Sequence, residues 1–303
     1  MKKIHFLGAA MMAAVMSLGL ISCGSDDEID NPIIGPTIEE VDKAIEAMKP
    51  IALDPAKDSE HFKTITFKGD APLTKLHILD DGKVLAVMTE TPALSPTRAN
   101  SNVFAEGTYT VNPDGSVTAS VAGYTIKVGM TDNMTTINDV LYSTEMTTGT
   151  TSNASATLCR TWYPVNYDVV AYVKDKVIGH YEETSLMALQ STLSKELGTD
   201  VKLLEGDVNK ITFMTNSTII TNYKNKNYAV ANWAWTSEAA GILTASFSAN
   251  DQDMMNIPTF VRFEKGTPNT CYLVSAFKTV TTGMNNEEFT VDLKVVITMK
   301  DAK

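Results

Sequence analysis

The sequence predicts a mostly β protein made of two antiparallel β-barrel or sandwich lobes, with a short N-terminal helix and one inserted amphipathic helix. Three observations predict this class. From residue 62 onward, apolar and polar residues alternate with a period of two in many short runs. Turn-forming residues separate these runs. Consecutive strands joined by short turns favour an antiparallel meander, because parallel pairing needs long crossovers.

Residues 1–22 have the composition of a secretory signal peptide. Two lysines give a basic start, residues 6–21 carry no charge, and the small residue Ser22 precedes Cys23. The uncharged stretch is shorter than the roughly 20 residues that a membrane-spanning helix needs. We therefore expect this segment to direct export and to be removed.

The four residues "LISC", ending at Cys23, resemble the lipobox of bacterial lipoproteins, in which the cysteine is acylated and becomes the first residue of the mature chain. The resemblance implies that Cys23 anchors the protein to a lipid bilayer. Two or more acyl chains hold a protein stably at a membrane. The alternative is an ordinary secretory signal with a chance cysteine.

An acidic tether is predicted over residues 23–36, because residues 26–36 combine acids with two prolines and a glycine. The acids at 26–28, just after the cysteine, resemble the surface-export signals of Bacteroidota lipoproteins. Gly24 stands where an aspartate would resemble an inner-membrane retention signal. These resemblances imply a lipid-anchored protein of the outer membrane that faces the cell surface.

The first helix is predicted over residues 37–50. Thr37 and Glu40 have the spacing of a capping box, and Pro50 ends the segment. Apolar residues recur on one face of this helix: Ile38, Val41, Ile45 and Met48. We expect that face to pack against the following sheet or to continue the stalk.

The first β lobe is predicted over residues 60–142. Asp81 and Gly82 lie at the centre of one predicted hairpin, and residues 113–115 (Pro-Asp-Gly) form the turn of another. Between these hairpins, residues 91–102 contain two prolines and no periodicity, which is typical of a loop.

A boundary between the lobes is predicted over residues 143–157. Nine of these residues are Ser or Thr, and almost none is large enough for a core. A polar edge strand would share this composition, so both interpretations remain open.

The second β lobe is predicted over residues 158–303, with one amphipathic helix that ends at Gly198. Four leucines at helical spacing predict that helix: Leu186, Leu189, Leu193 and Leu197. The predicted strands lie at 157–164, 167–173, 208–214, 218–224, 227–238, 241–247, 258–266, 270–280 and 288–300.

Five short motifs resemble lipocalin-like lipoproteins of Bacteroides and its relatives. They are "GTYTV" at 107–111, "LCRTW" at 158–162, "ITF" at 211–213, "NWAW" at 232–235 and "CYL" at 271–273. The resemblance implies two lipocalin-like, partly open β-barrel lobes, and it brings no catalytic residue.

Four aromatic residues are the candidate ligand-binding residues. Trp233 and Trp235 share one face of a predicted strand, and Trp162 and Tyr167 cluster near Cys159. Aromatic rings on an inner face would line an apolar pocket or bind a sugar ring if the barrel is incompletely filled. The alternative is that they form an ordinary core.

Cys159 and Cys271 are the two cysteines outside the lipobox. In an exported protein they could pair as a disulfide. They could equally be two separate buried thiols, since free cysteine packs as a small apolar residue. Sequence alone leaves both alternatives open and favours buried thiols slightly, because nothing shows that their Cβ atoms meet.

No catalytic residue, metal site or cofactor is predicted. His61, His77 and His180 lack a second histidine at i+3 or i+4, so each is interpreted as a strand or turn residue. The acidic doublets at 182–183 and 287–288 are interpreted as surface charge, since neighbours on a strand point to opposite faces. A polar turn at 250–253 lacks the glycine of a calcium loop.

These features predict a non-catalytic surface lipoprotein that binds a small hydrophobic or glycan ligand, or that acts as an accessory protein. The net charge of −11 opposes binding to nucleic acid. The alternative is an adhesin or fimbrial subunit, processed near Arg98 by a trypsin-like protease to free a groove for strand donation. A hydrolase is the third hypothesis, and nothing in the sequence nominates its site.

Overall fold

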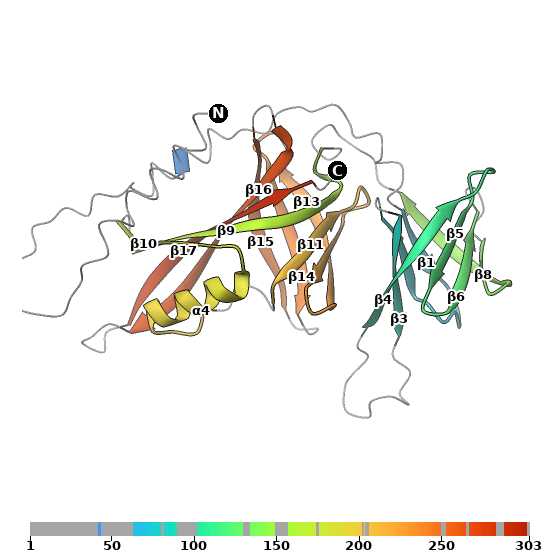
Figure 1. The fold of residues 1–303 in the computed structure, drawn as a ribbon, viewed down its shortest axis with the longest axis horizontal. Helices are drawn as coiled ribbons and strands as arrows, with labels where there is room; N and C mark the ends of the chain where they lie inside the picture. The colour runs from blue at the N-terminus through green and yellow to red at the C-terminus, as the bar shows by residue number, and fades with distance from the viewer. Residues whose placement is uncertain are drawn as a thin grey trace, which may run out of the picture.

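The computed structural model contains two eight-stranded antiparallel β-barrels and one described helix, α4 (Leu186–Leu197), as Figure 1 shows. It describes residues 42–43, 63–79, 82–89, 102–129, 134–148, 157–173, 176–201, 203, 206–249, 253–264, 267–282 and 288–301. Within these ranges, no helix has the length and hydrophobicity required to cross a membrane. The two β lobes predicted from the sequence are confirmed as barrels.

The first barrel is a meander in which each strand pairs with the next, and β1 pairs with β8 to close the ring. Its strands are β1 (Lys63–Phe67), β2 (Lys75–Ile78), β3 (Lys83–Thr89), β4 (Asn102–Val111), β5 (Val117–Val121), β6 (Tyr124–Val128), β7 (Met134–Ile137) and β8 (Val140–Thr148). The glycines of both predicted turns have a positive φ, 75° at Gly82 and 83° at Gly115, as such turns require.

The first lobe ends at Thr148, the last residue of β8, and not at residue 142 as the sequence predicts. Residues 143–148 are too polar for an ordinary core, yet they pair with β1 and complete the wall. The buried hydroxyl of Thr144 lies 3.2 Å from that of Thr135, so the polar group has a partner. The alternative of a polar strand therefore applies to these residues, while 149–156 lie outside the described part of the chain.

The core of the first barrel consists of apolar side chains from alternate positions of its strands. Gly107 allows β4 and β5 to approach closely, because a Cβ there would lie 2.2 Å from the Ser120 carbonyl oxygen. The buried core residues are Ile65, Phe67, Leu73, Leu76, Ile78, Val84, Ala86, Val117, Ala119, Val121, Ile126, Val128 and Ile137.

The second barrel closes through strand β9, which pairs with both β11 and β17. Strand β10 pairs with the same edge of β9 beyond β11, so it branches off the ring. The strands are β9 (Thr161–Val173), β10 (Lys176–Glu183), β11 (Val208–Phe213), β12 (Thr218–Tyr223), β13 (Tyr228–Ser237), β14 (Ile242–Ala249), β15 (Asp253–Glu264), β16 (Thr267–Thr282) and β17 (Glu288–Lys300).

Strand β9 is one strand where the sequence predicts two. The register between β9 and β17 shifts opposite Pro164 and Asn166, so a bulge lies between Trp162 and Tyr167. Proline is tolerated at such a bulge because the ladder is already interrupted there. The bulge breaks the alternation of the sequence without breaking the strand.

Helix α4 is confirmed together with its predicted C-terminal end at Gly198. The Ser185 side chain caps the N-terminus by accepting a hydrogen bond from the Ala188 amide, and Gly198 adopts the left-handed conformation with φ of 63°. The helix predicted at 37–50 lies outside the described residues except for Asp42 and Lys43, which are helical. Asp42 forms an ion pair with Lys294 on β17.

The two barrels contact each other through the outer faces of β3 and β4 on one side and of β11 to β13 on the other. Leu85 of the first barrel belongs to the core cluster of the second. The rings of Phe104 and Tyr228 lie 6.1 Å apart, and the Tyr228 hydroxyl donates to Glu106 at 2.7 Å. The lobes therefore share a packed interface.

Candidate functional site

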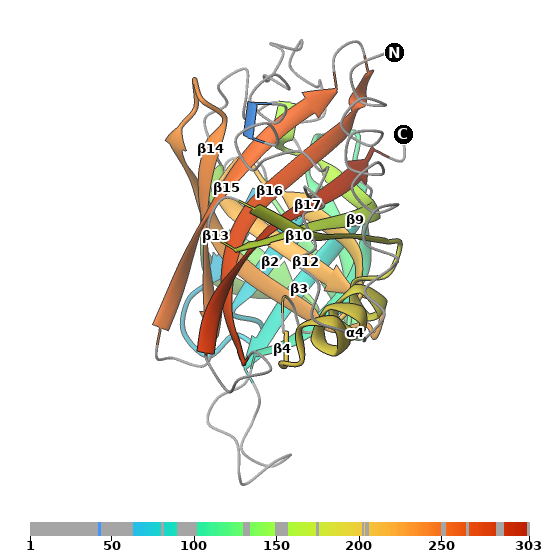
Figure 2. The ribbon, with the colours of Figure 1, turned by 90° about the vertical axis from the view of Figure 1, so that its left-hand side faces the viewer.

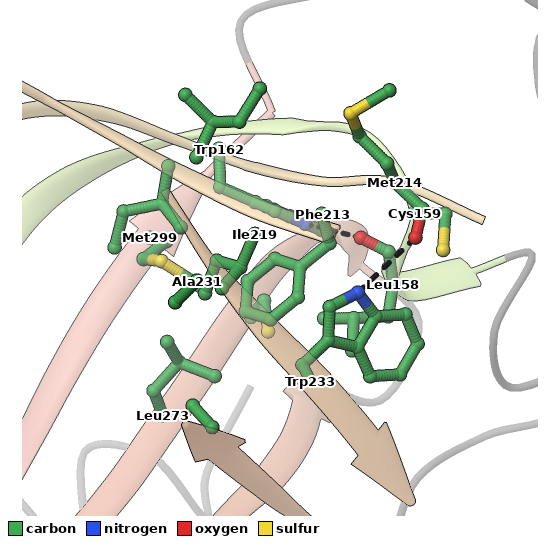
Figure 3. Packing of buried hydrophobic residues seen from close by; sticks show 14 of the residues in the cluster. Leu158, Cys159, Trp162, Phe213, Met214, Ile219, Ala231, Trp233, Leu273 and Met299 are labelled. Carbon is green, nitrogen blue, oxygen red and sulfur yellow. Dashed lines mark hydrogen bonds between the residues drawn. The ribbon is translucent and has the colours of Figure 1, made fainter. Parts of the chain in front are cut away.

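One end of the second barrel is filled by a packed core that contains two indole rings (Figure 3). Trp162 is fully buried, and its Nε1 donates to the Leu158 carbonyl oxygen at 2.8 Å. Trp233 is also buried, and its Nε1 donates to the Met214 carbonyl oxygen at 3.2 Å. Because both indole N–H groups are paired, this end is a satisfied core.

The four predicted aromatic residues belong to the core around the site. Trp233 and Trp235 share the inner face, with ring centroids 5.7 Å apart and planes perpendicular. Trp162 and Tyr167 are both buried, on either side of the bulge in β9. None of the four is among the described residues that line the cavity in this barrel. Their role in binding stays a prediction.

A cavity of about 90 Å³ lies inside the second barrel, beyond the packed end. It is lined by inward-facing residues of six strands and by two residues that lie across them. The lining residues are Leu186, Leu203, Ile211, Phe213, Ile219, Thr221, Leu243, Ala245, Thr259, Leu273, Ser275, Phe277, Val295 and Ile297. The barrel interior is therefore incompletely filled.

The lining of the cavity is apolar except for three hydroxyl groups. Thr259 and Ser275 face each other across β15 and β16, with 2.9 Å between their side-chain oxygens. Thr221 on β12 supplies the third hydroxyl. No charged side chain is among the described lining residues, so the cavity favours an apolar guest.

Helix α4 lies at this end of the second barrel in both views (Figure 1 and Figure 2). Leu186 from the first turn of the helix and Leu203 from the connection to β11 both line the cavity. Leu189 and Leu193 are buried against β9 and β17 in a neighbouring cluster. The first turn of the helix thus borders the cavity through Leu186.

The N-terminus of α4 is held by Asp207, which directly precedes β11. The Ser185 hydroxyl and the Met187 amide each donate to this carboxylate at 2.9 Å. Burial alone would raise the pKa of Asp207, but these hydrogen bonds and Lys224 lower it below its usual 3.8. The carboxylate is therefore ionised at neutral pH and stabilises the positive end of the helix.

Cys159 and Cys271 are separate buried thiols in the core of the second barrel. The sequence leaves open a disulfide or two separate thiols, and the structure shows the separate thiols. Burial raises the pKa of both groups, and nearby Arg160 offsets this only in part. They remain protonated and are poor nucleophiles.

The remaining polar candidates do not converge on one site. His77 lies on β2 and His180 on β10, and among the described residues no three His, Cys, Asp or Glu side chains are grouped to bind a metal. Glu182 accepts a hydrogen bond from Asn166 on the neighbouring strand. His61 and most of the polar turn at 250–253 lie outside the described residues.

Cys23 and Arg98, on which the predicted anchor and the predicted processing depend, also lie outside the described residues. The flanking strands of the Arg98 segment are described. Strand β3 pairs with β4 along the whole length of β3, from Lys83 to Thr89.

The cavity residues are the functional candidates that sequence reasoning missed. The sequence marks these residues only by the alternation of inward and outward positions. Leu243 and Ala245, like Thr259 and Ser275, lie at inward positions of their strands. Alternation marks every inward residue and does not tell which of them border empty space. Comparison of the chain with known protein families and with curated proteins finds no match to either.

Proposed function

We propose that the protein is a lipid-anchored surface binding protein whose second barrel holds a small apolar ligand beneath α4. The observation that supports this proposal is the cavity of about 90 Å³ with its apolar lining. Moving apolar surface from water into such a site contributes about 25 cal/mol per Å². Binding there needs no catalytic group.

The lining favours an aliphatic ligand over a glycan. A sugar brings many hydroxyl groups, and each one buried without a partner costs about 1–3 kcal/mol. The three hydroxyl side chains at Thr221, Thr259 and Ser275 are too few to satisfy it. The cavity is also smaller than the roughly 150 Å³ apolar cavity that binds benzene in an engineered protein. The bound group is therefore narrow.

The two ends of the second barrel differ in how a ligand could reach the cavity. The Trp162 and Trp233 end is filled, so entry from that side would require opening a packed core. The α4 end is covered by one helix and one connecting segment, through Leu186 and Leu203. We propose that the ligand enters there, and that the barrel resembles a lipocalin in having one packed and one accessible end.

The address in this proposal is based on the sequence of the first 28 residues. An uncharged segment, the "LISC" motif at Cys23 and the acids after it together support export, acylation and a place on the outer face of the outer membrane. The partner at this end of the chain is the lipid bilayer.

The proposal of binding without catalysis is supported by the state of the two thiols. Burial keeps Cys159 and Cys271 protonated, so neither is an activated nucleophile. The adhesin alternative, with processing near Arg98, has less support. It requires early strands that can be released, whereas β1 is paired with β2 on one side and β8 on the other.

The function is tested by titrating the intact protein with straight-chain alcohols and fatty acids of increasing length, and with mono- and oligosaccharides. Thermal shift and native mass spectrometry report binding. We expect aliphatic compounds to bind and raise the melting temperature, and sugars to have no effect. Absence of binding by every aliphatic compound, or binding of sugars alone, would overturn the proposal.

The proposed acylation and membrane location are tested separately with Cys23→Ser in cells given labelled palmitate. We expect the unchanged chain to carry the label in the membrane fraction, and the variant to be unlabelled and released. A labelled variant, or an unlabelled original chain, would contradict acylation at this cysteine.

A further inference from the structure

His77 lies on the outer face of the first barrel, where the second barrel covers it. Its side chain is 1% exposed. Its neighbours along β2, Leu76 and Ile78, point into the first barrel's core, so the imidazole points outward. Beside it in register lie Thr64 on β1 and Leu85 on β3, and Leu85 packs into the core cluster of the second barrel. The contact between the barrels therefore buries the imidazole.

A short hydrogen-bond chain crosses the contact and ends at this ring. The Asn216 amide nitrogen, from the turn between β11 and β12, donates to the Thr64 hydroxyl oxygen at 2.6 Å. The Thr64 oxygen lies 2.9 Å from His77 Nδ1, so this nitrogen has a hydrogen-bond partner. Within the described residues, Nε2 is buried and has no hydrogen-bond partner.

The charged groups around the contact do not compensate a positive imidazole. Lys75, on the same strand, opposes a second positive charge. On β4, one strand beyond β3, Glu106 is already paired with Lys83 at 3.7 Å and with Lys210 at 3.6 Å, and it accepts from Tyr228. Protonation of the ring would therefore bury an uncompensated charge, which is strongly unfavourable.

We propose that the contact between the two barrels is an acid-sensitive joint, in which protonation of His77 separates the barrels while each barrel stays folded. Each barrel has its own closed ring of strands. The core of the first barrel contains no residue of the second, whereas the core cluster of the second takes in Leu79 and Leu85 of the first at the contact. Because His77 is on an outer face, parting the barrels hydrates the charged ring without unfolding either one. Separation is the smallest rearrangement that achieves this.

The direction of the pH dependence follows from the two states. Burial, and then Lys75, lower the pKa of His77 from 6.5 to about 4 in the closed form. In the separated form the ring is hydrated, and its pKa returns toward 6.5. The closed form is thus fully stable above pH 6.5 and is progressively weakened as the pH falls toward 4. The equilibrium constant for separation rises by up to about 300-fold over this range.

The test measures the distance between the barrels in the full chain. Spin labels are placed on cysteines at two exposed turns, Asp139→Cys and Ala239→Cys, in a Cys23→Ser background. The buried Cys159 and Cys271 remain unlabelled. We expect one narrow distance at pH 7.5 and a growing second, longer distance between pH 6.5 and 4. Far-UV circular dichroism should stay unchanged over the same range, since the strands of both barrels remain folded.

Two variants distinguish the effect of protonating His77 from the effect of protonating Glu106. His77→Gln keeps a hydrogen-bonding side chain that does not titrate, so the short distance should persist to pH 4. The matched control, Glu106→Gln, removes the other titratable group and should retain the pH-dependent opening. If His77→Gln does not fold, the NMR titration of His77 in the unchanged chain must follow the appearance of the long distance.

Three results would overturn the proposal. They are a single distance at every pH, an opening that His77→Gln leaves unchanged, and a loss of far-UV signal in step with the opening.

Discussion

The aromatic ring of Phe213 meets that of Trp233 edge to face, with 5.8 Å between centroids and 79° between planes. Phe213 lines the cavity of the second barrel, whereas Trp233 lies behind it in the packed core. Trp233 therefore holds a wall of the cavity in place without lining it. The core and the cavity are physically continuous, so changes in one are expected to affect the other.

Replacing Trp233 by alanine should lower the free energy of unfolding by about 3–5 kcal/mol, the usual cost of removing a large buried aromatic ring. Urea unfolding followed by far-UV circular dichroism measures this loss. Trp235→Ala is the matched control, because Trp235 is only partly buried and should cost less. Equal losses in the two variants would show that Trp233 has no special place in the core.

Filling the cavity should abolish ligand binding without loss of stability. Ala245 lines the cavity, and Ala245→Ile adds three carbon atoms to the empty space. We expect affinity for aliphatic compounds to fall at least about tenfold, or 1.4 kcal/mol. The free energy of unfolding should stay equal or rise by about 1 kcal/mol, because the new carbons are buried. Isothermal titration and urea unfolding measure the two effects.

Ala234→Ile is the control for that variant, since it makes the same change at an exposed position on the outer face of β13. Its affinity should equal that of the unchanged chain. Undiminished binding by Ala245→Ile would place the ligand elsewhere on the molecule.

The hold of Asp207 on α4 should depend on its charge. Asp207→Asn should weaken protection of the helix by about 1 kcal/mol, the typical contribution of an N-terminal cap, as measured by amide hydrogen exchange at neutral pH. Because the pKa of Asp207 is lowered in the folded chain, its contribution is complete above pH 3.8 and is lost as the pH falls further. The stability difference between variant and unchanged chain should therefore vanish in acid.

Asp200→Asn, at an exposed aspartate beyond the other end of α4, should leave exchange unchanged. A difference between Asp207→Asn and the unchanged chain that persists at pH 2 would argue against an electrostatic hold.

The two thiols of the second barrel should be inert in the folded protein. Maleimide should add to neither Cys159 nor Cys271 until the chain is unfolded, because burial keeps both protonated and inaccessible. Intact mass spectrometry counts the additions. An added cysteine at exposed position 239 serves as the reactive control. A mass change on reduction of the native protein would reveal a disulfide and refute the separate thiols.

Much of this fold could be predicted from the sequence because its signals are local. Strands show as alternation, and α4 shows as four leucines at helical spacing with Gly198 at its end. The turn residues Gly82 and Gly115 adopt the conformations their types suggest. Each of these features is determined within a few residues of chain.

The differences arise where partners far along the chain decide the outcome. Residues 143–148 look like a linker by composition, and they form a strand because β1 needs a partner to close the ring. Pro164 suggests a strand end, but pairing with β17 continues across it. In both cases hydrogen bonds to distant strands override the local preference.

The cavity could not be predicted from the sequence because empty space is a property of the whole barrel. The large aromatic residues were predicted to line a pocket, yet Trp162 and Trp233 fill their end of the interior. Smaller residues on β14 to β16, such as Ala245 and Ser275, leave the space unfilled. Which positions face each other across the interior depends on register and strand tilt, which alternation does not encode.

The pairing of β9 with β17 also has a consequence for the order of assembly. Tyr163, near the start of β9, pairs with Lys300 in β17, at the far end of the second lobe. A chain that emerges N-terminus first can complete the first barrel at Thr148, but the second must wait for its last strand. Such non-local closure is slow, and an unpaired edge invites association with other chains. The second barrel therefore sets the pace of maturation, and β9 is the segment that needs protection until β17 arrives.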